Sequence, residues 1–186
     1  MVEESPTTEI RETRTIRWGS IFIWIGVIGI LLILALALTR SKQGPIGIGE
    51  KAPNFILTTF DGEQIDIVDL RGKVVLINFW ASWCGPCEQE AAELEQAYQV
   101  FKDQGVVFLG VDYVDTETEA LDYLSKFNIT YPNGPDLRTA ISQAFRIQGV
   151  PETYIVGREG VLVDLRIGPY LSLAQIEDAL QRALEQ

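Results

Sequence analysis

Histidine is absent from this sequence of 186 residues, and methionine occurs only as Met1. The chain therefore lacks the commonest metal ligand and general base of proteins, together with the usual axial ligands of haem. Basic residues are also few, because 15 lysines and arginines stand against 26 aspartates and glutamates, for a net charge of −11. The sequence has no basic cluster, which argues against nucleic acid as a partner, since phosphate binding needs a basic face.

Cysteine is scarce too, and the two present are Cys84 and Cys87, in the stretch NFWASWCGPCEQE. A disulfide that closes so short a loop stabilises little, so a purely structural staple is disfavoured. Tetrahedral zinc needs four ligands, and two thiolates without histidine cannot complete such a site unless carboxylates join them. Two thiolates could carry copper, although a copper carrier would usually add a histidine or a methionine. We therefore expect no metal and favour a redox couple.

The local sequence gives this couple a mechanism. A continuous apolar run over residues 74–80 indicates a buried strand, and a helical pattern begins at Cys84. The free amides and the dipole at the start of a helix favour a thiolate, and Pro86 suits the first helical turn. We expect Cys84 to be the exposed nucleophile that forms a mixed disulfide. Cys87, one turn into the helix, would be the more buried thiol that releases the product.

The amino-terminal part carries a long apolar run over residues 18–38, interrupted only by Ser20. As a helix it would be about 31 Å long at ~1.5 Å per residue, which matches the core of a bilayer. We interpret the chain as four segments: a short cytoplasmic tail (1–17), a transmembrane anchor (18–39), a linker (40–49) and a globular domain (50–186).

Three arginines precede the run, and Arg40 and Lys42 follow it. This small bias favours a cytoplasmic amino terminus, in a single-pass protein of the cell membrane whose domain is extracytoplasmic or periplasmic. A signal peptide cleaved at the ALA of residues 35–37 is the alternative. The apolar run is longer than the ~7–15 residues of a signal peptide's apolar region, which favours the anchor.

The globular domain alternates strands and helices. Two short apolar runs around Asp61-Gly62 indicate a hairpin. A second buried strand is expected over 106–114, and a second hairpin around the REG of residues 158–160. We expect helices from Cys84 to about 104, over 116–127, over 136–145, and from Ser172, as the cap, onward. This order is typical of an α/β fold with a mixed sheet.

These residues resemble the thioredoxin superfamily in FWASWCGPC, and its membrane-anchored TlpA-like group more closely. The similar stretches are APNFILTTFDGEQIDIVDLRGKVVLINFWASWCGPCEQE, GVDYVD and GVPETYIVGREG. This group includes ResA and the CcmG (DsbE) proteins of cytochrome c maturation. The resemblance implies a thioredoxin-like fold with an added amino-terminal β-hairpin and a central insertion over 115–136.

The resemblance also assigns roles to residues. Pro151 matches the cis-proline beside the cysteine pair, and Val150 before it would offer backbone groups to a substrate strand. Glu90 would exchange the proton of Cys87, although an acid in a first helical turn can also serve only the helix dipole. Substrate contact is expected from Trp83, Gly85, Pro86, Val150, Pro151 and Glu152. Glu152 could equally be a hydrogen-bonding residue at a strand start.

The resemblance implies a thiol-disulfide oxidoreductase whose only redox centre is the Cys84–Cys87 disulfide, without a further cofactor. Its client would be a disulfide-containing protein such as apocytochrome c, and a membrane thiol-electron transporter would re-reduce it. The alternatives are a general or copper-site cysteine reductase, an oxidant of folding proteins, a peroxidase of related fold, and a copper-binding or non-catalytic module.

Overall fold

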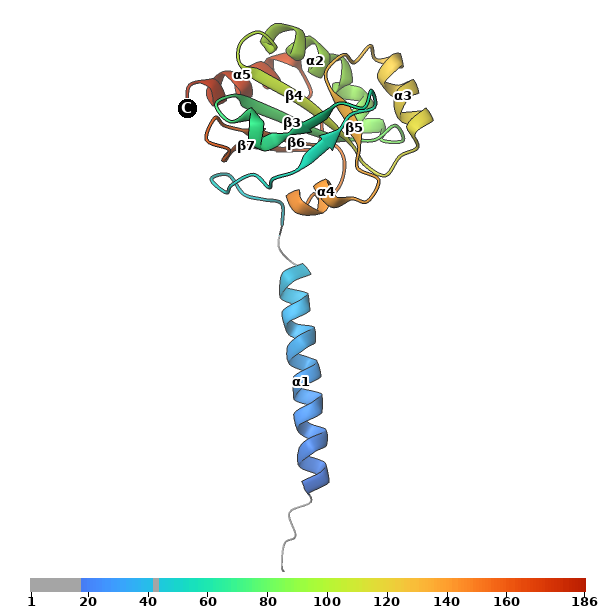
Figure 1. The fold of residues 1–186 in the computed structure, drawn as a ribbon, viewed down its shortest axis with the longest axis vertical. Coiled ribbons are helices and arrows are strands. Elements are labelled where there is room, and N and C mark those ends of the chain that lie inside the picture. Colours follow the sequence, from blue (N-terminus) through green and yellow to red (C-terminus); the bar gives the residue numbers. More distant parts are fainter. Residues whose placement is uncertain (1–17, 42–43) are drawn as a thin grey trace, which may run out of the picture. The chain divides into compact units, whose positions relative to one another are not determined.

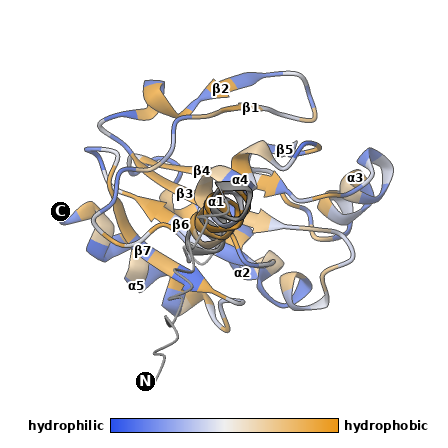
Figure 2. Cartoon of the chain, turned by 90° about the horizontal axis from the view of Figure 1, so that it is seen from below, coloured by the Kyte–Doolittle hydropathy of each residue, from blue (hydrophilic) through white to orange (hydrophobic). Residues whose placement is uncertain are grey.

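The computed structural model describes residues 18–41 and 44–186. The chain divides into two compact units, and the second runs from Gly44 to Gln186. The first contains the helix α1 (Trp18–Ser41), which Figure 2 shows end-on, with residues in the hydrophobic colour. The expected tail over residues 1–17 lies outside the described residues. Within the part of the chain that the structure describes, no helix is both long enough and apolar enough to cross a membrane.

The second unit is built on a five-stranded sheet in the order β5-β4-β3-β6-β7 (Figure 1). Strands β3, β4 and β5 are parallel, whereas β6 runs antiparallel to both β3 and β7, so the expected mixed sheet is confirmed. The strand bounds are β3 Val74–Trp80, β4 Val106–Asp112, β5 Asn133–Pro135, β6 Glu152–Val156 and β7 Leu162–Ile167.

Strand β3 lies at the centre of the sheet and is buried along its whole length. Val75, Ile77 and Phe79 belong to the core on one face of the sheet. Val74 and Leu76, which alternate with them, belong to the core on the other face. Burial on both faces explains why this strand reads as a continuous apolar run.

Helices cover both faces of the sheet (Figure 1). Side chains of α2 (Gly85–Phe101) and α5 (Leu173–Leu184) fill the core on one face. The short helix α4 (Ala140–Phe145) contributes to the core on the opposite face. The remaining helix, α3 (Glu117–Lys126), lies inside the expected central insertion and packs Ala120 and Tyr123 beside the cysteines.

A hairpin precedes the sheet, as expected. Strands β1 (Ile56–Thr58) and β2 (Gln64–Asp66) pair antiparallel, and a short 3-10 helix, η1 (Ile67–Leu70), follows. Gly62 lies in the connecting turn with φ of 89°, which glycine adopts without steric cost. Asp61-Gly62 was therefore a sufficient signal for this turn.

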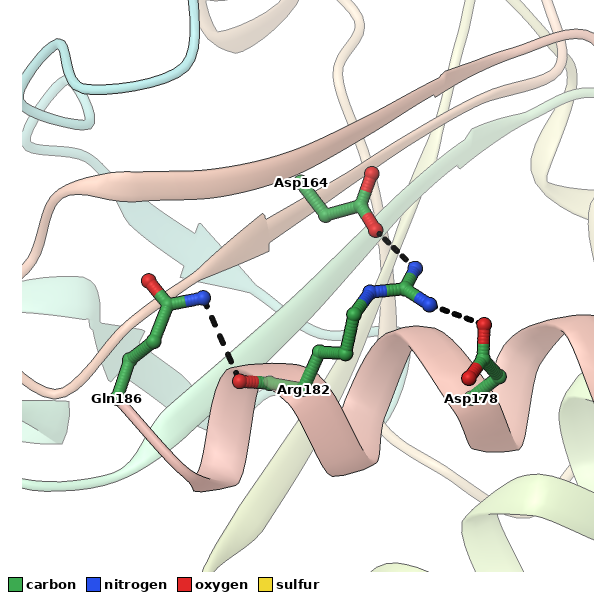
Figure 3. A network of polar contacts seen from close by, with 4 residues as sticks. All are labelled: Asp164, Asp178, Arg182 and Gln186. Atoms are coloured by element: carbon green, nitrogen blue, oxygen red, sulfur yellow. Dashed lines mark hydrogen bonds and ion pairs between the residues drawn. The ribbon is translucent and has the colours of Figure 1, made fainter.

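Surface charges tie α5 to the outer strand. In Figure 3, Arg182 lies between Asp164 of β7 and Asp178 of its own helix. Its guanidinium is 3.1 Å from the Asp164 carboxylate, and the Gln186 amide donates to the Arg182 carbonyl at 3.4 Å. Arg182 and Asp178 are exposed and Asp164 is only half-buried, so these ion pairs contribute little. We attribute the docking of α5 mainly to its buried apolar face, which includes Ile176 and Leu180.

Several expected boundaries were wrong. The linker expected over 40–49 is helical up to Ser41, and its second half belongs to the globular unit. Ile46 is buried there, its amide donates to the Phe145 carbonyl, and that of Gly49 donates to the Leu162 carbonyl. The domain therefore begins at Gly44, because these backbone groups are satisfied by it rather than by water.

The helix expected over 136–145 begins only at Ala140. The Asp136 carboxylate accepts the amides of Ile141 and Ser142 and thus caps the helix from a distance, while Thr139 takes the left-handed conformation. The strand β5 was not expected at all, because its sequence, Asn-Gly-Pro, is typical of turns.

The other ends shift by a few residues. Helix α2 ends at Phe101 rather than near 104, and β4 ends at Asp112 rather than at 114. Ser172 does stand at the cap position of α5, but its side chain makes no capping hydrogen bond.

Candidate active site

The two cysteines lie at the amino terminus of α2 and form a disulfide. Cys84 is the cap residue, and its Sγ accepts a hydrogen bond from the Cys87 amide at 3.2 Å. Pro86 stands in the first turn, where its missing N–H leaves no bond unmade. The same amide and the helix dipole would stabilise a thiolate at Cys84 once the disulfide is reduced.

The expected exposure of Cys84 is wrong for this oxidised form. Cys84 is 4% exposed and Cys87 is 1% exposed. Both are therefore buried, and only the expectation that Cys87 is the more buried of the two agrees with the structure. Both pack in one cluster with Trp80, Ala91 and other apolar side chains. Any client must therefore approach Cys84 closely along the surface around it.

The residues expected to contact a client lie on two segments. Trp83 is 60% exposed, and its indole donates to the Val114 carbonyl at 3.2 Å. Gly85 and Pro86 are exposed in the first turn of α2. The Val150–Pro151 peptide bond is cis, as expected, and Val150 packs against the cluster that contains the cysteines.

Glu90 lies one turn after Cys87 on α2 and is only 1% exposed. Its carboxylate accepts the Asn78 amide of β3 at 2.8 Å and the Tyr170 backbone amide at 2.7 Å. Burial raises the pKa of Glu90 to about 7, although the Tyr170 amide, Asn78 and the charge of Arg166 each oppose this shift. Glu90 can therefore gain or lose a proton close to neutral pH, one helical turn from the more buried cysteine.

Glu152 is also buried, but it faces the backbone of the loop before Pro151. Its carboxylate accepts the amides of Gln148 at 2.8 Å and Gly149 at 3.2 Å, and the Tyr154 hydroxyl at 2.7 Å. All these partners belong to the protein, and the residue is 1% exposed. The structure thus places Glu152 where it fixes the loop that presents Val150.

Sequence reasoning did not find several residues of this region. Tyr170 donates its amide to Glu90 from 80 positions away, and Thr153 accepts a hydrogen bond from Asn78 at 3.0 Å. Asp112 ends strand β4 opposite Trp80, and Asp115 follows three residues later and accepts the Ser82 amide. The signal for these two was present, because acids at the carboxyl end of a buried strand lie close to the end of its parallel neighbour.

Among the residues that the structure describes, no group of three or more His, Cys, Asp or Glu side chains could hold a metal ion. The chemistry that the site supports is thiol-disulfide exchange, with a cysteine at a helix start and a buried acid nearby.

Comparison with known proteins points the same way. Residues 48–165 match the AhpC/TSA family. A thiol-disulfide oxidoreductase ResA of Bacillus cereus is 30% identical over 162 residues, which cover 87% of this chain and 91% of that protein. ResA of Bacillus subtilis is 31% identical over 147 residues, which cover 75% of this chain and 82% of that protein.

Among solved structures, a thiol:disulfide interchange protein of the thioredoxin family from Chlorobium tepidum TLS superposes with a TM-score of 0.67. It is 26% identical, and the match covers 75% of this chain and 99% of that one. The thioredoxin-like fold is thus supported by sequence and by structure. The chain belongs to the AhpC/TSA family and, within it, to the thiol-disulfide oxidoreductases related to ResA.

Proposed function

We propose that this protein is a membrane-anchored extracytoplasmic reductase that opens disulfides of client proteins during cytochrome c maturation. The observation that carries the proposal is the acid Glu90, buried one turn after the resolving cysteine, with a pKa raised by burial to about 7. A reductase must give up two electrons together with the proton of a buried thiol, and in this proposal Glu90 receives that proton.

The reaction begins with the reduced protein. The Cys84 thiolate attacks one sulfur of the client disulfide, forms a mixed disulfide and expels the first client thiolate. Glu90 takes the proton of Cys87, whose thiolate then attacks the Cys84 sulfur. The Cys84–Cys87 disulfide forms, the second client thiolate leaves, and two electrons have passed to the client. This end product is the disulfide form described above.

The client surface would be the exposed indole of Trp83 together with the backbone of Val150 before the cis-proline. Apocytochrome c is the proposed client, and a membrane thiol-electron transporter is the proposed source of electrons. Support comes from the relatives, which carry the name thiol-disulfide oxidoreductase ResA, and from the resemblance to proteins of cytochrome c maturation.

Membrane anchoring is proposed from the sequence. The run over 18–38 is apolar or small apart from Ser20, and the side chains from Phe22 to Leu36 that the structure describes are large, apolar and exposed in most positions. A surface of this kind needs an apolar environment. Fractionation of cells that express the full chain and a chain starting at residue 44 tests this, and an unchanged distribution would refute the anchor.

The reduction potential of the Cys84–Cys87 couple tests the direction of electron flow. We expect a value near or below about −220 mV, in the range of glutaredoxins and thioredoxin. A value near about −120 mV, as in strong oxidants, would refute the reductase and favour an oxidant of folding proteins. In cells that lack the protein, c-type cytochromes should be lost and should return with the wild-type chain but not with Cys84→Ser. Unchanged cytochrome levels would refute this client class.

A further inference from the structure

A second segment holds the loop that leads to Cys84. The Tyr113 amide donates to the Trp80 carbonyl at 2.8 Å, and the Trp83 indole donates to the Val114 carbonyl at 3.2 Å. Between these two bonds, the Ser82 amide donates to the Asp115 carboxylate at 2.6 Å. Three hydrogen bonds thus connect residues 113–115 to residues 80–83, immediately before the nucleophile.

The backbone of this segment is strained. Val114 has φ of 50°, a left-handed conformation that β-branched residues rarely adopt. Such strain persists only where the surroundings enforce it, and it gathers at functional sites. In this segment it turns the Val114 carbonyl toward Trp83 while Asp115 reaches Ser82.

A buried acid immediately precedes this segment in the chain. Asp112 is the last residue of β4 and pairs in register with Trp80. It is 1% exposed, and its Oδ1 has no hydrogen-bond partner among the described residues. Burial raises the pKa of Asp112 to about 8, with a further increase from the nearby charge of Asp115 and from a hydrogen bond to its side chain.

The surroundings offer this pair no positive charge. Within the described part of the chain, neither acid forms an ion pair with a basic side chain. The neighbours of Asp112 on the adjoining strands, Trp80 and Pro135, are uncharged. From α3, Ala120 and Tyr123 pack beside Trp80, and burial raises the pKa of Tyr123 so that its phenol stays neutral. Asp115 is thus the charge that acts on Asp112.

We propose that Asp112 and Asp115 share one proton and act as positioning residues, which hold residues 81–83 so that Cys84 is presented to the client. Asp112 holds the proton and offers it to Asp115, whose side chain accepts the amides of Ser82 and Thr116. The two acids do not touch the reacting sulfurs. The inference rests on the attack by Cys84 that is proposed above.

Loss of the shared proton has a defined effect. Once Asp112 ionises, two carboxylates face each other in a buried site and repel. Asp115 then withdraws from Ser82, the loop loosens, and Cys84 loses its alignment. The fraction of Cys84 that is thiolate rises with pH. The reactivity of the thiolate form, normalised to that fraction, should nevertheless fall as pH rises past the pKa of Asp112.

The test measures the rate at which the reduced full-length chain reacts with the chromogenic disulfide dithiobis(nitrobenzoic acid), from neutral to alkaline pH. The thiolate absorbance of the same samples gives the fraction of thiolate, and dividing the measured rate by this fraction gives the reactivity of the thiolate itself. We expect the wild-type rate to fall about tenfold at alkaline pH, the scale set by loss of one hydrogen bond to a charged group. Asp112→Asn, whose amide still donates to Asp115, should keep the neutral-pH rate throughout.

Asp115 variants test the contact with Ser82. Asp115→Ala should lower the neutral-pH rate about tenfold, and Asp115→Asn, whose side-chain oxygen can still accept the Ser82 amide, should restore most of it. Asp103→Asn, on an exposed turn, is the matched control and should behave as wild type. A rate that falls with pH equally in wild type and Asp112→Asn would overturn the proposal.

Two further measurements separate possible failures. The chemical shift of the Ser82 amide proton should change with the titration of Asp112 in the wild type and stay constant in Asp112→Asn. A shift that stays constant in both proteins would overturn the shared proton.

The role of Cys84 is tested separately, and Cys84→Ser should not react at neutral pH. If it does react, the proposed role of Cys84 fails; if it is silent while Asp115→Ala matches wild type, the positioning role alone fails.

Discussion

Glu90 gives the sharpest prediction, because its burial changes stability in a pH-dependent way. Its pKa is raised from an ordinary 4.5 to about 7 in the folded protein. Between these values the folded state keeps a proton that the unfolded chain has released. The stability contributed by this group is therefore fully present below about pH 4.5 and is lost as pH rises through about 7. Each pKa unit is worth about 1.4 kcal/mol, so the loss is about 3 kcal/mol.

Glu90→Gln should remove this pH dependence. Glutamine has the shape of the protonated acid, and its oxygen can accept one of the two amides that Glu90 now accepts, those of Asn78 and Tyr170. We expect the variant to match the wild type near pH 4.5, the ordinary value of this acid. At about pH 8 we expect it to be more stable by about 3 kcal/mol, with the gain building up steadily between about pH 4.5 and 7 and levelling off above the folded pKa.

The assay is denaturant unfolding of the oxidised full-length chain at a series of pH values, followed by far-ultraviolet circular dichroism. The disulfide keeps the thiols from titrating, and subtraction of the wild-type curve removes the groups that both proteins share. Glu159→Gln, on an exposed turn, is the control and should show no pH-dependent difference. A difference between Glu90→Gln and wild type that stays constant with pH would refute the reasoning.

Three further predictions follow from the same contacts. Cys87→Ser should accumulate a mixed disulfide between Cys84 and the client, visible by non-reducing electrophoresis, because no thiol remains to release it. Gly110→Ala should destabilise the fold by about 1–3 kcal/mol in denaturant unfolding, because a Cβ at Gly110 would lie 1.6 Å from Asn133 Oδ1, which accepts the Trp80 indole at 2.8 Å. Phe145→Ala should cost about 3–5 kcal/mol in the same assay, because the ring is fully buried.

The sequence was sufficient wherever local signals and periodicity agreed. The strand β3 was predicted with its observed bounds, since seven apolar or buried residues follow one another there. The hairpin at Gly62 and the helix start at Cys84 depend on turn and cap chemistry that lies within a few residues. The cis bond before Pro151 was expected only from the family resemblance, since no local pattern specifies it.

Prediction failed where a contact joins distant segments. Glu90 meets the Tyr170 amide across 80 positions, and Ser82 meets Asp115 across 33. The second contact follows from strand order and register, which pair Trp80 with Asp112 and bring the loops after β3 and β4 together. The first joins α2 to the segment after β7, at the far end of the chain. The start of α4 failed for a related reason, because Asp136 caps it across intervening residues.

The absence of histidine explains why burial matters at this site. Thiol-disulfide exchange near neutral pH needs a group that takes and returns a proton in that range, the usual role of histidine with its pKa of about 6.5. A solvated glutamate is too acidic for this, but burial brings Glu90 to about 7. Burying the ionised carboxylate lowers the stability of the folded protein. The hydrogen bonds that Glu90 accepts from Asn78 and Tyr170 reduce this loss. We therefore expect a variant without Glu90 to be more stable above neutral pH and slower in releasing clients, because one buried acid causes both effects.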